Sequence, residues 1–180
     1  MDLFEKVPSI ESRRDYVGAS QVGDDCLRRA QLQYKQGSVV EGRMARIFDS
    51  GHHLEEAIIK WMVSSGFEIS DRQLSFELLD GKFKGHCDGI ITKAPKEFEI
   101  DKPCILEIKT ANSTRFKSFK RYGVVLTSRQ YAIQASLYQY GMTKENLDLI
   151  NNEVFFLFYN KDTSELHYEK LAFNYDLARS

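Results

Sequence analysis

The chain has 180 residues and a formal net charge of −1, with 42% hydrophobic and 28% charged residues. This length and composition are typical of one soluble globular domain, and no apolar run approaches the roughly 20 residues that span a bilayer, so no membrane partner is expected. The balanced charge gives no general attraction to nucleic acid, so any site for a polyanion has to arise from local clustering.

The first elements expected along the chain are helical. Residues 1–18 are expected to form a flexible N-terminal segment, and residues 19–180 a single domain. Ser20 is a suitable N-cap for a helix that runs to about Gln36. Apolar residues at helical spacing then predict a second helix over about 42–65. The opening residues lack the pattern of a signal peptide, so a cytoplasmic location is expected.

After the second helix the apolar pattern changes to that of strands. The expected elements are, in order, strands near 67–79, 83–92 and 104–110, helices near 113–121 and 128–142, and strands near 153–159 and 165–173. Asp80-Gly81 is a strong hairpin-turn signal. This order is not a regular βαβ series, and it predicts an α/β fold with a central mixed sheet flanked by helices.

The three cysteines, Cys26, Cys87 and Cys104, are odd in number and widely spaced. They form no C-x-x-C pair and no Cys/His cluster, so neither a disulfide framework nor a structural zinc site is indicated. Each is expected to be a small buried hydrophobe.

Two neighbouring strands of the expected sheet carry charged residues: Asp88 lies in one, and Glu107 and Lys109 lie in the next. Glu107 and Lys109 are two residues apart and so face the same side of a strand, with Ile108 facing the other side. If the strands pair, Asp88 reaches the same place. Two carboxylates that converge with a lysine suit Mg²⁺ or Mn²⁺, with the carbonyl of Ile108 as a further candidate ligand. The plain alternative is a surface Glu–Lys pair on one strand.

Three further features accompany this cluster. Gly85 and Gly89 flank Asp88 and permit close backbone approach to a site. Glu55 follows Gly51 by four residues in the second expected helix. The later helix contains Gln134 and Tyr138, also four residues apart and therefore on one helical face.

Taken together, these pairs resemble the RecB-type branch of the P-D…[DE]-x-K nucleases, which includes CRISPR-associated and phage exonucleases. The corresponding pairs are Gly51 with Glu55, Gly85 with Asp88, Glu107 with Lys109, and Gln134 with Tyr138. The resemblance implies a restriction-endonuclease-like core and Mg²⁺- or Mn²⁺-dependent hydrolysis of DNA. It also implies an exonuclease of replication, recombination or repair, located in the host cytoplasm if a phage encodes it.

The same resemblance assigns the roles of individual residues. Asp88, Glu107 and Lys109 would be catalytic, and Glu55, Asp88, Glu107 and Ile108 would hold the metal. Many relatives have a metal-binding His at the place of Glu55, and His52 or His53 stays open as a ligand. Iron–sulfur members add three cysteines near the C-terminus; because this chain has no Cys after Cys104, no iron–sulfur cluster is expected and phage-type members are more similar.

DNA, single- or double-stranded, is the expected partner, with a homo-oligomer or a recombination or replication protein as further candidates. The candidate substrate contacts are Gln134, Tyr138, Arg28, Arg29, Arg115, Lys117, Lys120 and Arg121. Ordinary packing is the alternative for Gln134 and Tyr138, and a solvated face is the alternative for the basic residues.

Two rival functions remain at this stage. One is a module of the same fold that binds nucleic acid or a protein without catalysis, although the intact Asp88, Glu107 and Lys109 argue against it. The other is a structure-specific endonuclease, which circular DNA distinguishes from an exonuclease because a strict exonuclease needs a strand end.

Overall fold

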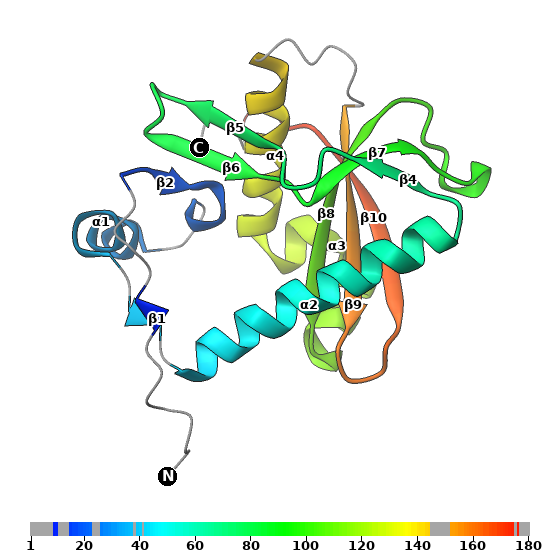
Figure 1. Ribbon diagram of the computed structural model, residues 1–180, viewed down its shortest axis with the longest axis horizontal. Helices are drawn as coiled ribbons and strands as arrows, with labels where there is room; N and C mark the ends of the chain where they lie inside the picture. Colours follow the sequence, from blue (N-terminus) through cyan, green and yellow to red (C-terminus); the bar gives the residue numbers. More distant parts are fainter. Residues whose placement is uncertain are drawn as a thin grey trace.

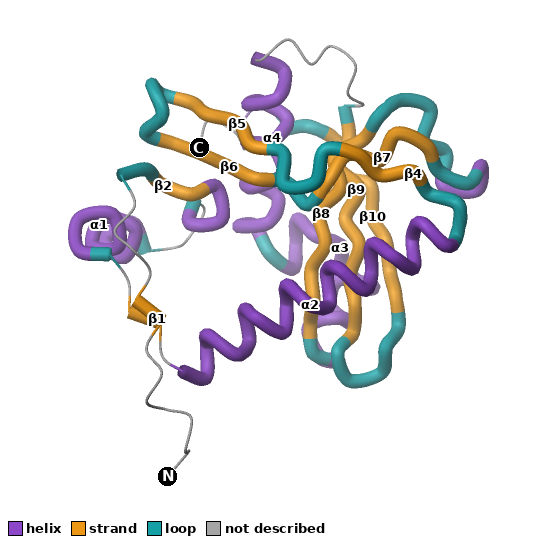
Figure 2. The backbone as a smooth tube through the Cα atoms, in the orientation of Figure 1, coloured by secondary structure: helices purple, strands orange, loops and turns teal. Residues whose placement is uncertain are grey.

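The computed structural model of the chain describes residues 9–10, 15–22, 26–37, 39–40, 42–144, 152–174 and 176 (Figures 1 and 2). The expected flexible segment 1–18 lies largely outside the described residues. The division into 1–18 and 19–180 therefore stays a prediction. None of the described helices combines the length and the apolar content that crossing a lipid bilayer requires.

A five-stranded sheet forms the centre of the fold, in the order β10-β9-β8-β7-β4. Its strands are β4 (Glu68–Ser70), β7 (Gly89–Lys93), β8 (Cys104–Ala111), β9 (Glu153–Asn160) and β10 (Leu166–Ala172). β8 and β9 run parallel, whereas the other neighbours are antiparallel. The expected central mixed sheet is thus confirmed.

Helices cover both faces of this sheet (Figure 1). α2 (Gly42–Ser64) crosses one face, and α3 (Ser113–Thr127) and α4 (Arg129–Lys144) pack against the other. Successive residues of β8 and β9 enter different apolar clusters, because neighbouring side chains of a strand point to opposite faces. Ile105 packs in the cluster of α3 and α4, whereas Leu106 packs in the cluster of α2. The strand that carries Glu107 is therefore buried on both sides.

A smaller sheet lies beside the central one, in the order β2-β6-β5. It consists of β2 (Val17–Gly18), β5 (Ser75–Leu78) and β6 (Phe83–His86). β5 and β6 form a hairpin around Asp80 and Gly81, as expected, and both of these residues have positive φ. The remaining elements are β1 (Ser9–Ile10), β3 (Val39–Val40), α1 (Leu27–Gln36) and the 3₁₀ turns at Ala19–Gln21 and Lys96–Phe98.

Two expected strands are each divided in two. The expected strand 67–79 becomes β4 and β5, and 83–92 becomes β6 and β7, so that the chain passes from one sheet to the other at both breaks. The first break is a turn in which Asp71 and Gln73 have positive φ. Neither residue is Gly or Pro, so the apolar pattern continues through the turn without a signal.

The N-terminal helix also differs from its expected bounds. Ser20 lies in the short turn Ala19–Gln21, which ends at Val22 in an extended conformation. α1 begins only at Leu27, after Cys26. Cys26 is exposed, which corrects the expectation of three buried cysteines, whereas Cys87 and Cys104 are fully buried.

Candidate active site

Asp88 lies where two strands of the central sheet separate. β7 pairs with β8 from Ile91–Cys104 to Gly89–Leu106, and Asp88 directly precedes that last pair. It is therefore at the break between β6 and β7, not within a strand as expected. Its N–H donates to the Leu106 carbonyl at 3.2 Å, and its Oδ2 accepts from the Ile108 N–H at 2.6 Å. The carboxylate thus replaces the strand that would have continued the ladder.

The backbone of Ile108 faces this open edge of β8. Within a strand, the N–H and C=O groups of one residue point toward the same neighbour. Because the N–H of Ile108 points to Asp88, its carbonyl points to the same side. This orientation agrees with the expected role of the carbonyl as a candidate ligand.

Glu107 and Lys109 lie together on the face of β8 that packs toward α4. Lys109 Nζ is 2.6 Å from Glu107 Oε1, and their side chains are 19% and 4% exposed. The ammonium group also lies 4.6 Å from the ring centroid of Tyr131 on α4. The plain alternative of a surface Glu–Lys pair is excluded by this burial.

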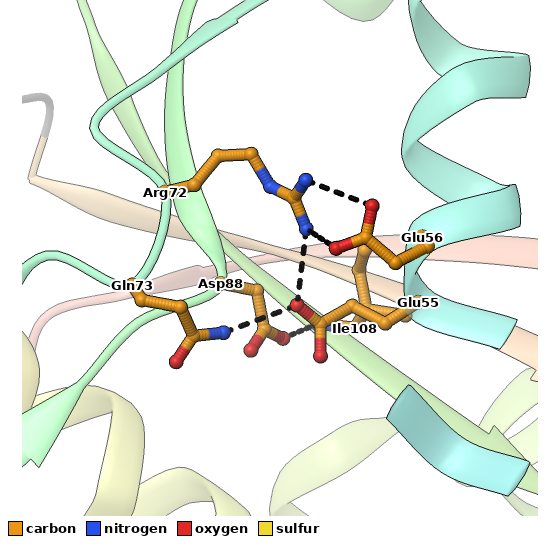
Figure 3. Close-up of polar contacts among 6 residues, drawn as sticks. All are labelled: Glu55, Glu56, Arg72, Gln73, Asp88 and Ile108. Atoms are coloured by element: carbon orange, nitrogen blue, oxygen red, sulfur yellow. Dashed lines mark hydrogen bonds and ion pairs between the residues drawn. The ribbon is translucent and has the colours of Figure 1, made fainter. Parts of the chain in front are cut away.

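Glu55 reaches the cluster from α2 on the other side of the sheet (Figure 3). Its Oε1 accepts from Gln73 Nε2 at 3.1 Å and lies 3.8 Å from Arg72 Nη2. Asp88 raises the pKa of Glu55 in addition to burial, which shows that the two carboxylates interact. Asp88 and Glu55 also add to the rise that burial causes in the pKa of Glu107. Glu55, Asp88 and Glu107 therefore lie in one region, and together they form the acidic cluster.

The two histidines of α2 differ in their relation to this region. Burial raises the pKa of both Glu55 and Asp88, and His52 is among the groups that oppose the shift. His53 instead lies 3.8 Å from Asp49, and its side chain is 81% exposed. Of the two, His52 is the one that interacts with the carboxylates.

Burial is the largest influence on the pKa values of the cluster. Burial raises the pKa of Glu107 to about 8, although Lys109 opposes the shift, and burial also raises the pKa of Asp88. Burial lowers the pKa of Lys109, but Glu107 and Tyr131 outweigh it, so its net shift is upward. Lys109 is therefore a cation at neutral pH.

The donor set fits a hard divalent cation. Glu107 Oε2 is buried and has no hydrogen-bond partner, which is costly for a carboxylate oxygen unless it meets a cation. In the described part of the chain, no three His, Cys, Asp or Glu side chains stand together as a ready metal cage. Gln73 holds Glu55 through Oε1 and Lys109 holds Glu107 through Oε1, so Glu107 Oε2 is the oxygen that a cation could meet without breaking these contacts.

Gln134 and Tyr138 lie on the inward face of α4. Gln134 Nε2 donates to the Tyr138 hydroxyl at 2.6 Å, and the residues are 4% and 3% exposed. Burial raises the pKa of Tyr138, and Glu107 adds to the shift, so the phenol lies near the acidic cluster. Their burial and mutual pairing favour a supporting role over direct contact with a substrate.

The glycines around Asp88 serve the packing of side chains. A Cβ at Gly85 would collide with the ring of Phe76 and approach Tyr138 at 2.9 Å, and one at Gly89 would come within 2.8 Å of Ile69. The expected close backbone approach to a ligand is therefore replaced by close approach of apolar side chains.

The six basic candidates are exposed on two helices that Figure 1 shows apart. Arg28 and Arg29 belong to α1, whereas Arg115, Lys117, Lys120 and Arg121 belong to α3. The guanidinium of Arg115 lies 5.5 Å from the ring centroid of Tyr131, the ring that Lys109 also contacts. Arg115 is thus the member of the group that an interaction connects to the acidic cluster.

Four residues of the site have no signal in the sequence motifs. Arg72 and Gln73 come from the turn between β4 and β5, Glu56 follows Glu55, and Tyr131 lies on α4. Glu56 could have been noticed as a second acid beside the motif, whereas the contact of Arg72 with α2 joins positions far apart in the chain.

No protein-family model and no curated protein matches this sequence. Solved structures match the fold. The crystal structure of SSO0001 has a TM-score of 0.57 at 15% identity, covering 94% of this chain and 73% of that one. The alkaline exonuclease LHK-Exo from Laribacter hongkongensis has a TM-score of 0.57 at 16% identity, covering 93% and 82%, respectively. LHK-Exo in complex with dAMP has a TM-score of 0.52 at 15% identity, with the same coverage. The mixed sheet flanked by helices is thus a fold that a nuclease uses.

Proposed function

We propose that this protein is a metal-dependent DNA nuclease, acting as an exonuclease with Mg²⁺ or Mn²⁺. The observation that carries the proposal is the position of Asp88, held by the Ile108 N–H where β7 separates from β8, close to the Glu107–Lys109 pair and interacting with Glu55 of α2. The fold shared with LHK-Exo supports it. A role in recombination or repair and a phage origin belong to the same proposal.

Each residue of the cluster has a role that follows from its contacts. Asp88 is fixed by the Ile108 N–H, and Gln73 orients Glu55. Lys109 donates one N–H to Glu107 and has further N–H groups to orient a water molecule against the phosphodiester. A divalent cation bound by these carboxylates would polarise the phosphate and offset charge on the leaving oxygen.

The test is cleavage of labelled linear single- and double-stranded DNA with Mg²⁺, Mn²⁺ or EDTA. We expect Glu107→Gln and Lys109→Ala to lower the rate by roughly 10²-fold or more. Glu68→Gln and Lys93→Ala are matched controls, since these residues form an exposed ion pair in the same sheet. Intact covalently closed circles would identify an exonuclease, and cut circles an endonuclease.

Metal binding is tested separately by thermal unfolding with and without Mn²⁺. The metal should stabilise the wild type, by about 2.7 kcal/mol at a hundred times its dissociation constant, and should not stabilise Glu107→Gln. A folded wild type that gains no stability from metal and leaves every substrate intact would reject the nuclease in favour of a non-catalytic binding module.

A further inference from the structure

Arg72 is a partly exposed cation beside the acidic cluster that the nuclease motif does not include. Its guanidinium forms two hydrogen bonds with the carboxylate of Glu56, one of them 3.0 Å long, and lies 3.8 Å from Glu55 Oε1 (Figure 3). Burial raises the pKa of Asp88, and Arg72 is among the groups that oppose this shift. Arg72 is 38% exposed and Lys109 is 19% exposed, so Arg72 is the more accessible of these two cations.

The turn that carries Arg72 has an unusual backbone conformation. Asp71 and Gln73, on either side of it, have φ values of 47° and 57°, a region that residues other than glycine rarely adopt. The Leu74 N–H closes the turn on the Asp71 carbonyl at 3.1 Å. Gln73 meanwhile holds Glu55. Strained backbone that is retained beside a polar cluster is typical of functional sites.

The carboxylate of Glu56 binds the guanidinium of Arg72 in the way that a phosphate would. The planar fork of arginine pairs with two oxygens of a carboxylate or of a phosphate in the same geometry. Glu56 is 53% exposed, so water and salt screen its attraction to Arg72. A phosphate that arrives at the rim of the cluster offers the same fork geometry and can therefore compete with Glu56 for the guanidinium.

We propose that Arg72 binds a backbone phosphate of the DNA strand next to the reacting one, and that Glu56 holds the guanidinium until the DNA arrives. This inference rests on the proposed nuclease function. It adds a substrate-binding residue from the β4–β5 turn, whose partner Glu56 competes with the DNA.

The test measures DNA affinity and its salt dependence with Mg²⁺ in a Lys109→Ala background, which prevents turnover. Arg72→Ala should weaken binding of a short duplex by about tenfold and reduce the salt slope by about one. Arg72→Lys should keep the slope but not the full affinity, because it retains the charge and loses the fork.

Glu56→Gln distinguishes phosphate binding from a structural brace. If Arg72 binds phosphate, Glu56→Gln releases the competing carboxylate and tightens DNA binding several-fold, opposite to Arg72→Ala. If the pair only braces the β4–β5 turn against α2, both substitutions weaken binding alike, and the inference is overturned. Thermal unfolding of each variant identifies any that fails to fold, and Glu56→Gln keeps the proposal testable because it retains Arg72.

Failure of this inference is distinct from failure of the nuclease proposal. In the first case the wild type cleaves DNA and Arg72→Ala binds it with unchanged affinity and slope. In the second case the wild type itself neither cleaves nor binds DNA.

Discussion

Single residues in the site differ in how their buried polar atoms are satisfied. Gln134 and Tyr138 satisfy one another, and the ring of Tyr138 also packs edge-on against Phe76 at 5.6 Å between centroids. Glu107 has one oxygen paired with Lys109 and one without a partner. The first pair is therefore suited to rigidity, whereas the open oxygen of Glu107 is suited to receiving a cation.

Tyr138→Phe is expected to lower the free energy of unfolding by about 1–3 kcal/mol. The ring stays in place, but the buried Nε2 of Gln134 loses its acceptor. Urea unfolding measures the effect. The double variant Gln134→Leu/Tyr138→Phe should cost less than the two single changes added together, because it leaves no orphaned donor. Strict additivity would show that the two side chains do not support one another.

The site residues that the sequence could predict are those whose spacing is local. Glu107 and Lys109 share a strand face, and Gln134 and Tyr138 share a helix face, so period alone places each pair. Arg72 was missed because its contact with α2 depends on how a turn without glycine or proline bends. Such a contact is set by tertiary packing, and no periodic pattern in the sequence predicts it.

At the scale of elements, α3 contains a break at a glycine. Gly123 has φ 76° and ψ 176°, so regular helix ends there, close to the expected end at about 121. Glu169 of β10 compensates by accepting the Val124 N–H at 2.8 Å. A carboxylate from a neighbouring strand thus caps the first turn of the short helical segment that follows Gly123, where negative charge is favourable.

The partial burial of Glu169 should make part of the stability depend on pH. Burial raises the pKa of Glu169 above its ordinary 4.5 in the folded state, although the Val124 N–H opposes the shift. The folded protein therefore binds this proton more tightly than the unfolded chain does. The resulting stabilisation is complete below the unfolded pKa and is lost as pH rises through the folded pKa.

Glu169→Gln should remove that dependence while keeping an oxygen for the Val124 N–H. We expect the variant to gain stability relative to the wild type as pH rises from about 4 to about 7. Urea unfolding at both values measures the difference. A wild type and a variant whose stabilities change in parallel with pH would show that Glu169 does not contribute.

On the scale of the whole molecule, helices cover both faces of the five-stranded sheet. The residues of the site come from the helices on both faces as well as from the sheet. Glu55 comes from α2 and Tyr131 from α4, while β8 between them supplies Glu107. Packing of α2 on the sheet is therefore a condition for the site. Ile58, fully buried three residues after Glu55, anchors the helix.

Ile58→Ala should lower the free energy of unfolding by about 2–5 kcal/mol, since it opens a cavity between α2 and the sheet. Val63→Ala on the same helix is the matched control, because Val63 is 53% exposed and should change stability by less than about 0.5 kcal/mol. Thermal or urea unfolding provides the comparison. Equal losses in the two variants would mean that α2 is not anchored through Ile58.

The parallel pairing of β8 with β9 has a consequence for the order of folding. β7 is a close neighbour of β8 in the chain, whereas the residues of α3 and α4 separate β9 from β8 in sequence. Contacts of this kind carry a loop-closure cost and form slowly. Until then one edge of β8 stays in water, and Glu107 is not yet enclosed. We therefore expect the acidic cluster to be completed late in folding, so that a metal would stabilise the finished protein without nucleating it.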